Sequence, residues 1–321
     1  MKKKILIAQD ITKPGKDAME AYGYEIKYGS GADAPSLIRD IADCEAAVIR
    51  TAPYTAEVLD AAKNLKVLSR CGIGVDNVDF AAADRLGIWV TNAPTCNLAT
   101  VAEATIGLLV SAGRRLSFLE REFRRGNFEI RNTCLGNEVQ GKTLSVVGLG
   151  RIGKTVCTKA MLGLGMRVVG YDPYVKKEDL PEGVELLDSW DAAFSRADFV
   201  SLHMPYNGKP LVGEHELSLM KPTAFLLNLA RGKVVDEKAL IRVLKGNRIA
   251  GAALDVFEDE PPKPDNPLLS MENVILTPHV TGLSHESFER AGLQNAESIH
   301  QALNGKKPDC ACNNPPNPRN M

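Results

Sequence analysis

The sequence carries almost no net charge and contains no long apolar run. Its 321 residues hold 39 Lys and Arg against 40 Asp and Glu, a formal net charge of -1. Proteins that bind nucleic acid or anionic membranes through surface charge have a clear basic excess, so we expect neither partner. No apolar stretch approaches the roughly 20 residues of a membrane span, and Ile5–Ala8 is too short for a signal peptide. We therefore expect a cytoplasmic protein with no membrane segment.

The sequence also lacks the cysteine spacing of zinc sites and redox-active disulfides. Its seven cysteines show no C-x-x-C pair, and they are Cys44, Cys71, Cys96, Cys134, Cys157, Cys310 and Cys312. This scatter is typical of a reduced compartment. The last two have no histidine or third cysteine beside them, so we expect a frayed tail and no metal site. The Asn- and Pro-rich composition of the last ~12 residues predicts disorder.

Short apolar runs do alternate with amphipathic stretches along most of the chain. In the first third, the runs 4–8, 46–49, 67–69 and 89–91 predict strands, and stretches such as 34–41 and 55–62 predict helices. After a long helical stretch at about 97–125, further strands are predicted at 143–147, 167–171, 199–202, 225–228, 249–254 and 274–276. This βαβ alternation indicates parallel sheets with helices on both faces.

The length and the two series of strands predict two α/β domains. An amphipathic stretch at 286–303 follows the last predicted strand and can return to the first domain. We therefore expect a discontinuous substrate domain, residues 1–97 plus 286–321, with a nucleotide-binding domain, residues 98–285, inserted into it. Both are expected to be doubly wound parallel sheets, flavodoxin-like in the substrate domain and Rossmann-like in the inserted one. The cleft between the domains is the expected ligand site.

A glycine-rich turn, GLGRIG at 148–153, follows the first strand predicted for the inserted domain. Gly148 allows the tight turn, Gly150 lets the backbone approach a pyrophosphate, and Gly153 lets the helix pack closely on the strand. The N-terminus of the following helix offers unpaired N–H groups to the phosphates. Together, the strand, the turn and the helix predict a dinucleotide site.

Asp172 ends the next predicted strand, at the position where a dinucleotide-binding domain carries an acid. Its carboxylate can accept hydrogen bonds from the ribose hydroxyls and would repel a 2′-phosphate. No arginine follows it directly, which favours NAD over NADP. Lys176 and Lys177 lie nearby, so the sequence does not fix how strict that preference is.

Three polar segments follow later strands of the same domain. Arg231 follows one strand, His279 follows another, and Glu258, Asp259 and Glu260 follow the strand between them. Ligands of doubly wound sheets bind beyond the carboxyl ends of the strands. A guanidinium binds a carboxylate, a histidine moves a proton, and a carboxylate orients the imidazole. On this reasoning, the three acids are equal candidates for the last role.

These segments resemble the D-isomer-specific 2-hydroxyacid dehydrogenase family, and most closely its 3-phosphoglycerate dehydrogenase branch. The resemblance runs from about Ala46 to Leu303. Its motifs are RCGIGVDNVD at 70–79, GLGRIG at 148–153, NLARG at 228–232, LDVF and EPP within 254–262, and LTPH at 276–279.

The resemblance implies NAD-dependent interconversion of a D-2-hydroxy acid and its 2-keto acid. It implies that Arg231 holds the substrate carboxylate, that His279 is the general acid/base, and that Glu260 pairs with His279. Including the residues of the glycine turn, the expected cofactor contacts are Gly148, Gly150, Arg151, Ile152, Gly153, Asp172, Leu229, Arg231, Asp255, His279 and Gly282. In this set, Arg151 and Ile152 match residues at the pyrophosphate, and Asp255 matches one beside the nicotinamide carboxamide.

The expected substrate contacts are Arg50, Arg70, Cys71, Gly72, Ile73, Gly74, Arg231 and His279. In the family, backbone N–H groups of the loop that 71–74 matches grip the substrate carboxylate. Arg50 and Arg70 match basic positions near the substrate phosphate in the phosphoglycerate branch, and two guanidiniums suit a dianion. The expected substrate pair is therefore 3-phosphoglycerate and phosphohydroxypyruvate, with hydroxypyruvate (glycerate) and D-lactate-type substrates as alternatives. The family often has threonine at Ile73 and in 204–210, so hydroxyl contacts to the cofactor are not expected there.

Two other functions occur on the same scaffold. The resemblance implies that the NAD-dependent formate dehydrogenases have a Gln–His pair where this chain has Glu260 and His279. Glu260 therefore argues against that function. Dinucleotide-sensing co-repressors carry long disordered tails, whereas the tail here is short. We also expect a homodimer built on the nucleotide domain, because residues 99–112 are apolar almost all round and the resemblance implies one. No regulatory domain is expected to follow the last helix.

Overall fold

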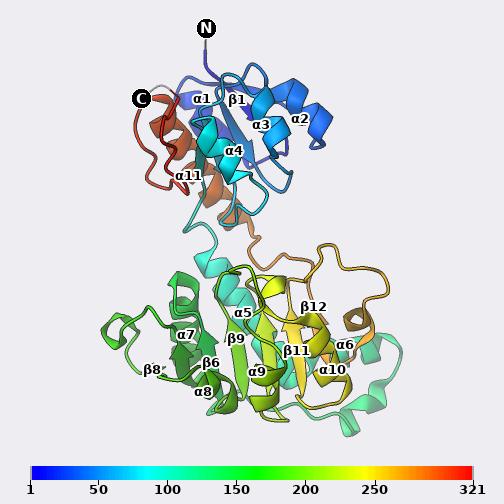
Figure 1. Cartoon of the computed structure of the whole chain (residues 1–321). Helices are drawn as coiled ribbons and strands as arrows, with labels where there is room; N and C mark the ends of the chain where they lie inside the picture. Colours follow the sequence, from blue (N-terminus) through cyan, green and yellow to red (C-terminus); the bar gives the residue numbers. More distant parts are fainter. Residues whose placement is uncertain (1, 320–321) are drawn as a thin grey trace. The chain divides into compact units, whose positions relative to one another are not determined.

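The computed structural model describes residues 2–319, which form two α/β units. Unit 1 is Met1–Asn97 with Leu283–Met321, and unit 2 is Leu98–Gly282. Each unit contains one parallel sheet flanked by helices, which confirms the fold class predicted from the sequence (Figure 1). The chain leaves unit 2 at Gly282, slightly before the predicted domain boundary at residue 285.

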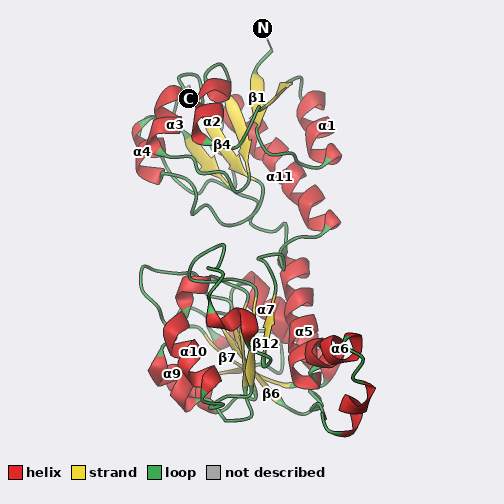
Figure 2. Ribbon diagram, turned by 90° about the vertical axis from the view of Figure 1, so that its right-hand side faces the viewer, coloured by secondary structure: helices red, strands yellow, loops and turns green. Residues whose placement is uncertain are grey.

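Unit 1 contains a five-stranded sheet in the order β2-β1-β3-β4-β5, which is the flavodoxin-like order. The strands are β1 (Lys4–Ile7), β2 (Glu25–Tyr28), β3 (Ala46–Ile49), β4 (Val67–Arg70) and β5 (Trp89–Thr91). One face is covered by α1 (Lys13–Ala21) and α11 (His285–Leu303), as Figure 2 shows. The other face is covered by α2 (Ala34–Ile41), α3 (Ala56–Ala61) and α4 (Phe80–Arg85). The edge strand β2 has the half-polar sequence EIKY and was not predicted.

Helices α1 and α11 approach each other closely at two glycines. A Cβ atom built on Gly15 would lie 2.7 Å from the Cα atom of Gly292. At the start of α11, the Oγ atom of Ser284 accepts a hydrogen bond of 3.1 Å from the backbone N–H of Ser287. The cap fixes where α11 begins, and the glycines fix how closely it packs on α1.

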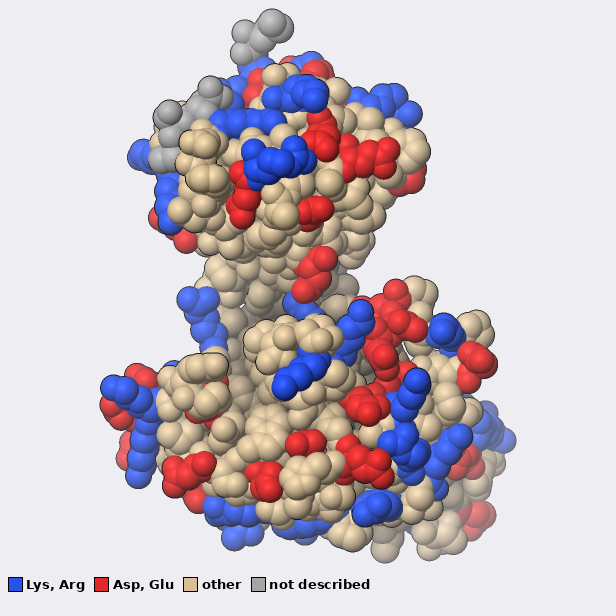
Figure 3. Space-filling view, viewed as in Figure 1, with Lys and Arg blue, Asp and Glu red and all other residues tan. Residues whose placement is uncertain are grey.

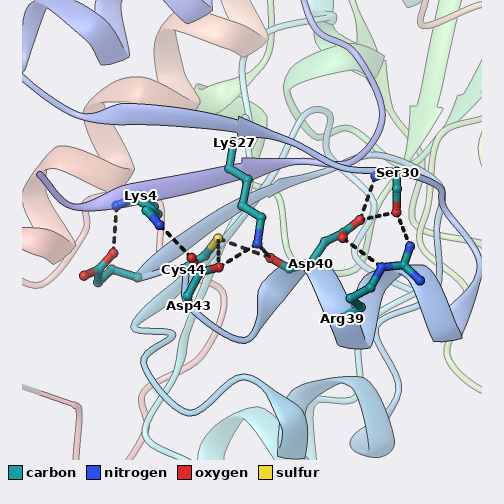
Figure 4. Close-up of polar contacts among 8 residues, drawn as sticks. Lys4, Lys27, Ser30, Arg39, Asp40, Asp43 and Cys44 are labelled. Carbon is teal, nitrogen blue, oxygen red and sulfur yellow. Dashed lines mark hydrogen bonds and ion pairs between the residues drawn. The ribbon is translucent and has the colours of Figure 1, made fainter.

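A polar network ties β1, β2 and the end of α2 together (Figure 4). Asp43 accepts hydrogen bonds from the Nζ atoms of Lys4 at 2.7 Å and Lys27 at 2.6 Å. These two hydrogen bonds hold the pKa of Asp43 well below its usual range, and the bond from Lys27 has the larger effect. Asp40 accepts from the backbone N–H of Ser30 at 2.6 Å and from its hydroxyl at 2.7 Å. The network therefore anchors the polar edge of the sheet, where apolar packing is sparse.

The C-terminal tail is ordered as far as residue 319, so the predicted disorder and frayed tail are wrong for 310–319. Ala311 forms an antiparallel bridge with Thr91 of β5, and the N–H of Cys312 donates to the carbonyl of Val90 at 2.7 Å. The Nη1 atom of Arg319 donates to three carbonyl oxygens in 62–65. Backbone pairing needs no apolar pattern, which is why composition did not reveal it. Residues 320 and 321 lie outside the described part of the chain.

Unit 2 contains a seven-stranded parallel sheet in the order β12-β11-β10-β9-β6-β7-β8. The strands are β6 (Thr143–Val147), β7 (Arg167–Tyr171), β8 (Glu185–Leu186), β9 (Phe199–Leu202), β10 (Phe225–Asn228), β11 (Gly251–Leu254) and β12 (Val274–Leu276). Counted from β6, this is the Rossmann order 3-2-1-4-5-6 with β12 added at one edge. The chain reverses its direction across the sheet between β6 and β9, which is where such folds bind ligands.

Helices cover both faces of this sheet. On one face, α5 (Leu98–Arg114) packs beside α7 (Arg151–Leu164). On the other are α8 (Trp190–Ser195), α9 (Glu214–Leu219) and α10 (Glu237–Lys245). The single long helix predicted over 97–125 is wrong. Arg115, with φ of 56°, breaks it into α5 and α6 (Leu116–Arg124).

The surface charge matches the composition. In Figure 3, basic and acidic side chains are interspersed over the visible face of each unit. Among the described residues, no helix is both long and apolar enough to cross a membrane.

Candidate active site

The glycine turn joins β6 to α7 in unit 2. Gly148 has φ of +96°, and a Cβ atom there would lie 2.7 Å from the carbonyl carbon of His203. A Cβ atom on Gly153 would lie 2.1 Å from the carbonyl oxygen of Gly148, so this position lets α7 sit close to the turn. A Cβ atom on Gly150, the N-cap of α7, would meet no atom within 4 Å. The backbone at Gly150 is therefore open, as a bound pyrophosphate requires.

Asp172 lies directly after β7 and faces this turn. One carboxylate oxygen accepts from the backbone N–H of Leu149 at 2.9 Å, and the other accepts from that of Tyr174 at 2.9 Å. The carboxylate is thus fixed beside the glycine turn, where the ribose of a dinucleotide would lie. Beside Gly150, Arg151 is exposed and Ile152 is half-buried against the core of unit 2.

The predicted reacting residues follow three neighbouring strands. Asn228 of β10 pairs with Leu254 of β11, which pairs with Leu276 of β12. Arg231, Asp255 and His279 therefore come from the same edge of the sheet, at the carboxyl ends of the strands. This edge is the one that carries the glycine turn.

His279 contacts one of the three candidate acids. Its Nδ1 atom lies 2.7 Å from an Oε atom of Glu260, whose other oxygen accepts from the N–H of Phe257 at 3.1 Å. Glu258 and Asp259 have other neighbours: the N–H of Glu258 donates to Glu237, and Asp259 lies 3.8 Å from Lys263. A carboxylate can only accept, so Nδ1 of His279 carries the proton and Nε2 is left to face a substrate.

Asp255 organises the segment that holds His279. Its backbone carbonyl accepts from the N–H of His279 at 2.8 Å, and this histidine has φ of 52°. One carboxylate oxygen accepts from the Thr277 hydroxyl at 2.6 Å and the Val280 N–H at 2.9 Å. The other accepts from the hydroxyl and the N–H of Thr281, at 2.5 and 3.0 Å. Asp255 is 1% exposed, so its four bonds stabilise an unusual backbone conformation from inside the unit.

Arg231 lies in a loop that is fixed on both sides. The Asn228 side chain donates to the Arg231 carbonyl at 2.9 Å and accepts from the Ala230 N–H at 3.1 Å. A Cβ atom on Gly232 would lie 1.8 Å from the carbonyl oxygen of Phe257, so this loop packs tightly on the segment after β11. Leu229 is buried within it. Gly282, the remaining predicted cofactor contact, is the last residue of unit 2.

In unit 1, the carbonyls of the loop 71–74 are all held from within the unit. Arg70 donates to Cys71 and Gly74, at 2.6 and 2.9 Å. The Ala93 N–H donates to the Gly72 carbonyl and the Asn92 side chain to that of Ile73, at 2.9 and 2.8 Å.

The amides of this loop divide into two kinds. Those of Cys71 and Gly72 are taken by the carbonyls of Ile49 and Arg70. Among the described residues, the Ile73 and Gly74 amides donate no hydrogen bond. Of the four amides predicted to hold a carboxylate, only these two are therefore not already used within the unit.

Arg50 and Arg70 are neighbours at the same edge of the unit 1 sheet, since Ile49 of β3 pairs with Arg70 of β4. Their side chains differ in use. Arg70 holds the loop 71–74, whereas Arg50 donates one hydrogen bond of 3.0 Å, to the Asp10 carbonyl. Burial raises the pKa of the Cys71 thiol, and the positive charges of Arg70 and Arg50 oppose that rise. Both guanidiniums therefore contribute to a positive field at the loop.

Comparison with known proteins shows the family of this chain. A family described as D-isomer specific 2-hydroxyacid dehydrogenase, NAD binding domain, matches residues 106–281. The chain belongs to the D-isomer specific 2-hydroxyacid dehydrogenase family. The matched segment lies within unit 2, so unit 2 contains the NAD-binding domain of this family.

Two curated relatives show the range of the family. A D-3-phosphoglycerate dehydrogenase from Methanocaldococcus jannaschii is 41% identical over 316 residues, covering 97% of this chain and 60% of that protein. A glyoxylate reductase from Korarchaeum cryptofilum is 39% identical over 319 residues, covering 96% and 95%. The chain thus spans about three fifths of the length of the phosphoglycerate dehydrogenase and nearly all of the reductase.

A solved structure with a related fold is the NADPH-dependent glyoxylate/hydroxypyruvate reductase from Sinorhizobium meliloti. It has a TM-score of 0.87 and 27% identity, and the match covers 99% of this chain and 100% of that one.

Sequence reasoning passed over two polar residues that follow strands, one in each unit. His203 follows β9 at the switch point of the sheet, and its Nε2 atom lies 2.8 Å from the Ser201 hydroxyl. Gln9 joins the loops after β1 and β3, because its side-chain oxygen accepts from the N–H groups of Thr51 and Ala52 at 2.9 Å. A polar residue directly after a predicted strand was the available signal for both. Among residues 2–319, no group of three or more His, Cys, Asp or Glu side chains could hold a metal ion.

Proposed function

We propose that this chain is an NAD-dependent dehydrogenase that interconverts a D-2-hydroxy acid and its 2-keto acid. The observation that carries the proposal is the pairing of His279 with Glu260 at 2.7 Å, at the same strand ends that carry Arg231 and the glycine turn. Family membership supports the same reaction.

The residues of unit 2 account for the proton in this reaction. When bound, NAD accepts the hydride from C2 of the hydroxy acid, or NADH supplies it to the keto acid. In the oxidative direction, Nε2 of His279 takes the proton of the C2 hydroxyl as the C2–O bond becomes a carbonyl. In reduction, the same nitrogen returns a proton to the carbonyl oxygen. Glu260 accepts from Nδ1 throughout, so it orients the ring and stabilises its positive form.

Substrate contacts are proposed for each unit by itself. In unit 2, the guanidinium of Arg231 forms a bidentate pair with the substrate carboxylate and polarises the adjacent C2 oxygen. In unit 1, the open amides of Ile73 and Gly74 donate hydrogen bonds to an anionic oxygen of the ligand. Asp172, fixed beside the glycine turn, favours NAD over NADP because its negative charge repels a 2′-phosphate.

The proposed substrate pair is 3-phosphoglycerate and phosphohydroxypyruvate. The positive field of Arg50 and Arg70 suits a phosphate, and a curated phosphoglycerate dehydrogenase is 41% identical. Hydroxypyruvate or glyoxylate is the second candidate, because the glyoxylate reductase relative matches this chain over nearly its whole length.

The test is NADH and NADPH consumption with phosphohydroxypyruvate, hydroxypyruvate, glyoxylate and pyruvate. We expect turnover with NADH, and we expect His279→Ala to lower kcat by about 10² or more. His285→Ala, which changes an exposed histidine at the start of α11, is the matched control and should keep full activity. Arg231→Lys should chiefly raise KM, since an ammonium cannot form the bidentate pair.

Two results would contradict the proposal. A His279→Ala variant with near-full turnover would remove the acid/base assignment. Absence of turnover by the wild type with every keto acid would favour a dinucleotide-binding regulator. Equal losses on phosphohydroxypyruvate and hydroxypyruvate in Arg50→Ala would leave the dehydrogenase assignment intact but remove the phosphate role.

We also propose that the protein is a homodimer assembled through unit 2. Large apolar side chains are exposed on α6 and the segment after it: Leu116, Phe123, Phe128 and Leu135, at 48%, 63%, 54% and 81%. Exposed apolar clusters of this kind mark protein interfaces. Sedimentation should give twice the chain mass of 34.8 kDa, and Phe123→Glu should lower it to a single chain.

A further inference from the structure

Arg50 is held from two sides at the switch point of the unit 1 sheet. This point lies between β1 and β3, where ligands of doubly wound sheets bind. The Nη1 atom of Arg50 donates to the carbonyl of Asp10, which follows β1. The guanidinium carbon lies 4.9 Å from the centre of the Phe288 ring, in the first turn of α11.

These two contacts restrain the guanidinium from two directions. Its central carbon lies over the Phe288 ring, and one of its nitrogens is held by the hydrogen bond to the Asp10 carbonyl. Among residues 2–319, the Arg50 side chain donates no other hydrogen bond. Most of its five N–H donors therefore stay available while the group itself is already oriented.

Among residues 2–319, this guanidinium forms no ion pair. The nearby Asp10 carboxylate lies 3.0 Å from the Nζ atom of Lys16 and forms its ion pair there. Phe288 is half-buried and packs on the core between the sheet, α1 and α11, and this packing holds its ring in place. Arg70, by contrast, donates to the loop 71–74 and is part of the frame of that loop.

We propose that Phe288 is a positioning residue that makes Arg50 the phosphate-binding group and so sets the preference for phosphorylated over unphosphorylated 2-keto acids. This inference rests on the proposed dehydrogenase function. The inference names Phe288 as the residue on which the choice of substrate depends. The Phe288 ring acts only through Arg50 and touches no reacting atom. A guanidinium that is oriented before binding loses less freedom when the phosphate arrives.

The test compares kcat and KM for phosphohydroxypyruvate and hydroxypyruvate in Phe288→Leu. We expect KM for phosphohydroxypyruvate to rise about two- to fivefold, the range of an exposed cation–π contact, with kcat unchanged. KM for hydroxypyruvate should stay the same, because that substrate has no phosphate. Phe288→Tyr, which keeps the ring, should restore the wild-type values.

Tyr22→Leu is the matched control. It removes an aromatic ring stacked on His300 at the other end of α11, at a ring distance of 3.9 Å, and should change neither KM. If Phe288→Leu folds poorly, Phe288→Met keeps a long apolar side chain without the ring and should give the same selective rise in KM.

The outcomes separate this inference from the function on which it rests. If the wild type prefers phosphohydroxypyruvate and Arg50→Ala loses that preference, an unchanged Phe288→Leu overturns the role of Phe288 alone. Equal losses on both substrates in Phe288→Leu would show a purely structural role and would also overturn it. A wild type without any preference for the phosphorylated substrate would overturn both the phosphate assignment and this inference, while the dehydrogenase function would stand.

Discussion

Replacing His203 with glutamine should remove most of the pH dependence of unit 2 stability between about pH 5 and 7.5. His203 follows β9, and its backbone N–H donates to the Val147 carbonyl at 2.7 Å. Its imidazole lies against the Ser201 hydroxyl. Burial lowers its pKa from 6.5 to about 4. The folded unit therefore holds this histidine neutral at a pH where the unfolded chain would protonate it.

The sign and size of the effect follow from this difference. Below about pH 6.5 the His203 imidazole is protonated in the unfolded state but stays neutral in the folded state. The free energy of unfolding therefore falls as the pH falls toward the folded pKa. With pKa values of 6.5 and about 4, lowering the pH from 7.5 to 5 should cost about 2 kcal/mol. His203 keeps some solvent exposure, so this figure is an upper value. The carboxylates whose pKa values are lowered titrate mostly below this window.

The assay is urea unfolding at a series of pH values, followed by tryptophan fluorescence. The chain has two tryptophans: Trp89 lies in unit 1, and Trp190 packs on Phe194 in unit 2. Trp89→Phe as a background therefore reports unit 2 alone. In that background we expect stability to fall toward pH 5 with His203 and to stay nearly flat with His203→Gln. His215→Gln, which removes an exposed histidine of the same unit, should leave the slope unchanged.

Equal slopes in the two variants would refute this account of His203. If His203→Gln does not fold, an NMR titration of the imidazole in the wild type decides the question directly. A folded-state pKa near 6.5 would show that the ring is not kept neutral by burial.

Two further predictions concern unit 1. Gly15→Ala should lower its free energy of unfolding by about 1–3 kcal/mol, because the new methyl group would overlap Gly292 and push the helices apart. Gly163→Ala, in α7 of unit 2 where a Cβ atom meets nothing within 4 Å, should be neutral or stabilising. Urea unfolding in a Trp190→Phe background reads the first variant through Trp89, and a Trp89→Phe background reads the second through Trp190. Deleting 310–321 should lower the stability of unit 1 by about 1–3 kcal/mol, since the hydrogen bonds to β5 and those of Arg319 are lost. An unchanged thermal midpoint after this deletion would show that the tail only lies on the surface.

The fold could be predicted where buried elements appear in the sequence as runs of apolar residues. Strands such as β3, with the sequence AAVI, and β9 are buried along their whole length, and both were found from their apolar runs. The break at Arg115 could not be found, because arginine has no intrinsic preference for the left-handed conformation it adopts. The tail at 310–319 was missed for a related reason. It is held by backbone groups and by Arg319, and neither leaves a periodic signal.

For the site, the types of residue could be predicted from the sequence, but their arrangement in space could not. Residue types and strand ends identified Arg231, His279 and an acidic segment, but three neighbouring acids have the same chemistry. The resemblance singled out Glu260, and the coordinates place its carboxylate 2.7 Å from His279. Sequence could not show that the Arg70 guanidinium is taken up by the loop carbonyls while Arg50 is not, because an arginine can hold its own backbone or bind a ligand equally well.

Asp255 shows why a residue can match a ligand position and still have another task. A carboxylate offers about four acceptor sites, and four hydrogen bonds from Thr277, Val280 and Thr281 occupy them. A contact from this carboxylate to the nicotinamide carboxamide would have to break one of these bonds inside a buried site. Breaking it would release the segment that keeps His279 at φ of 52° and within 2.7 Å of Glu260. The geometry therefore makes Asp255 first a support for the segment that carries His279, and any contact with the cofactor must be compatible with that role.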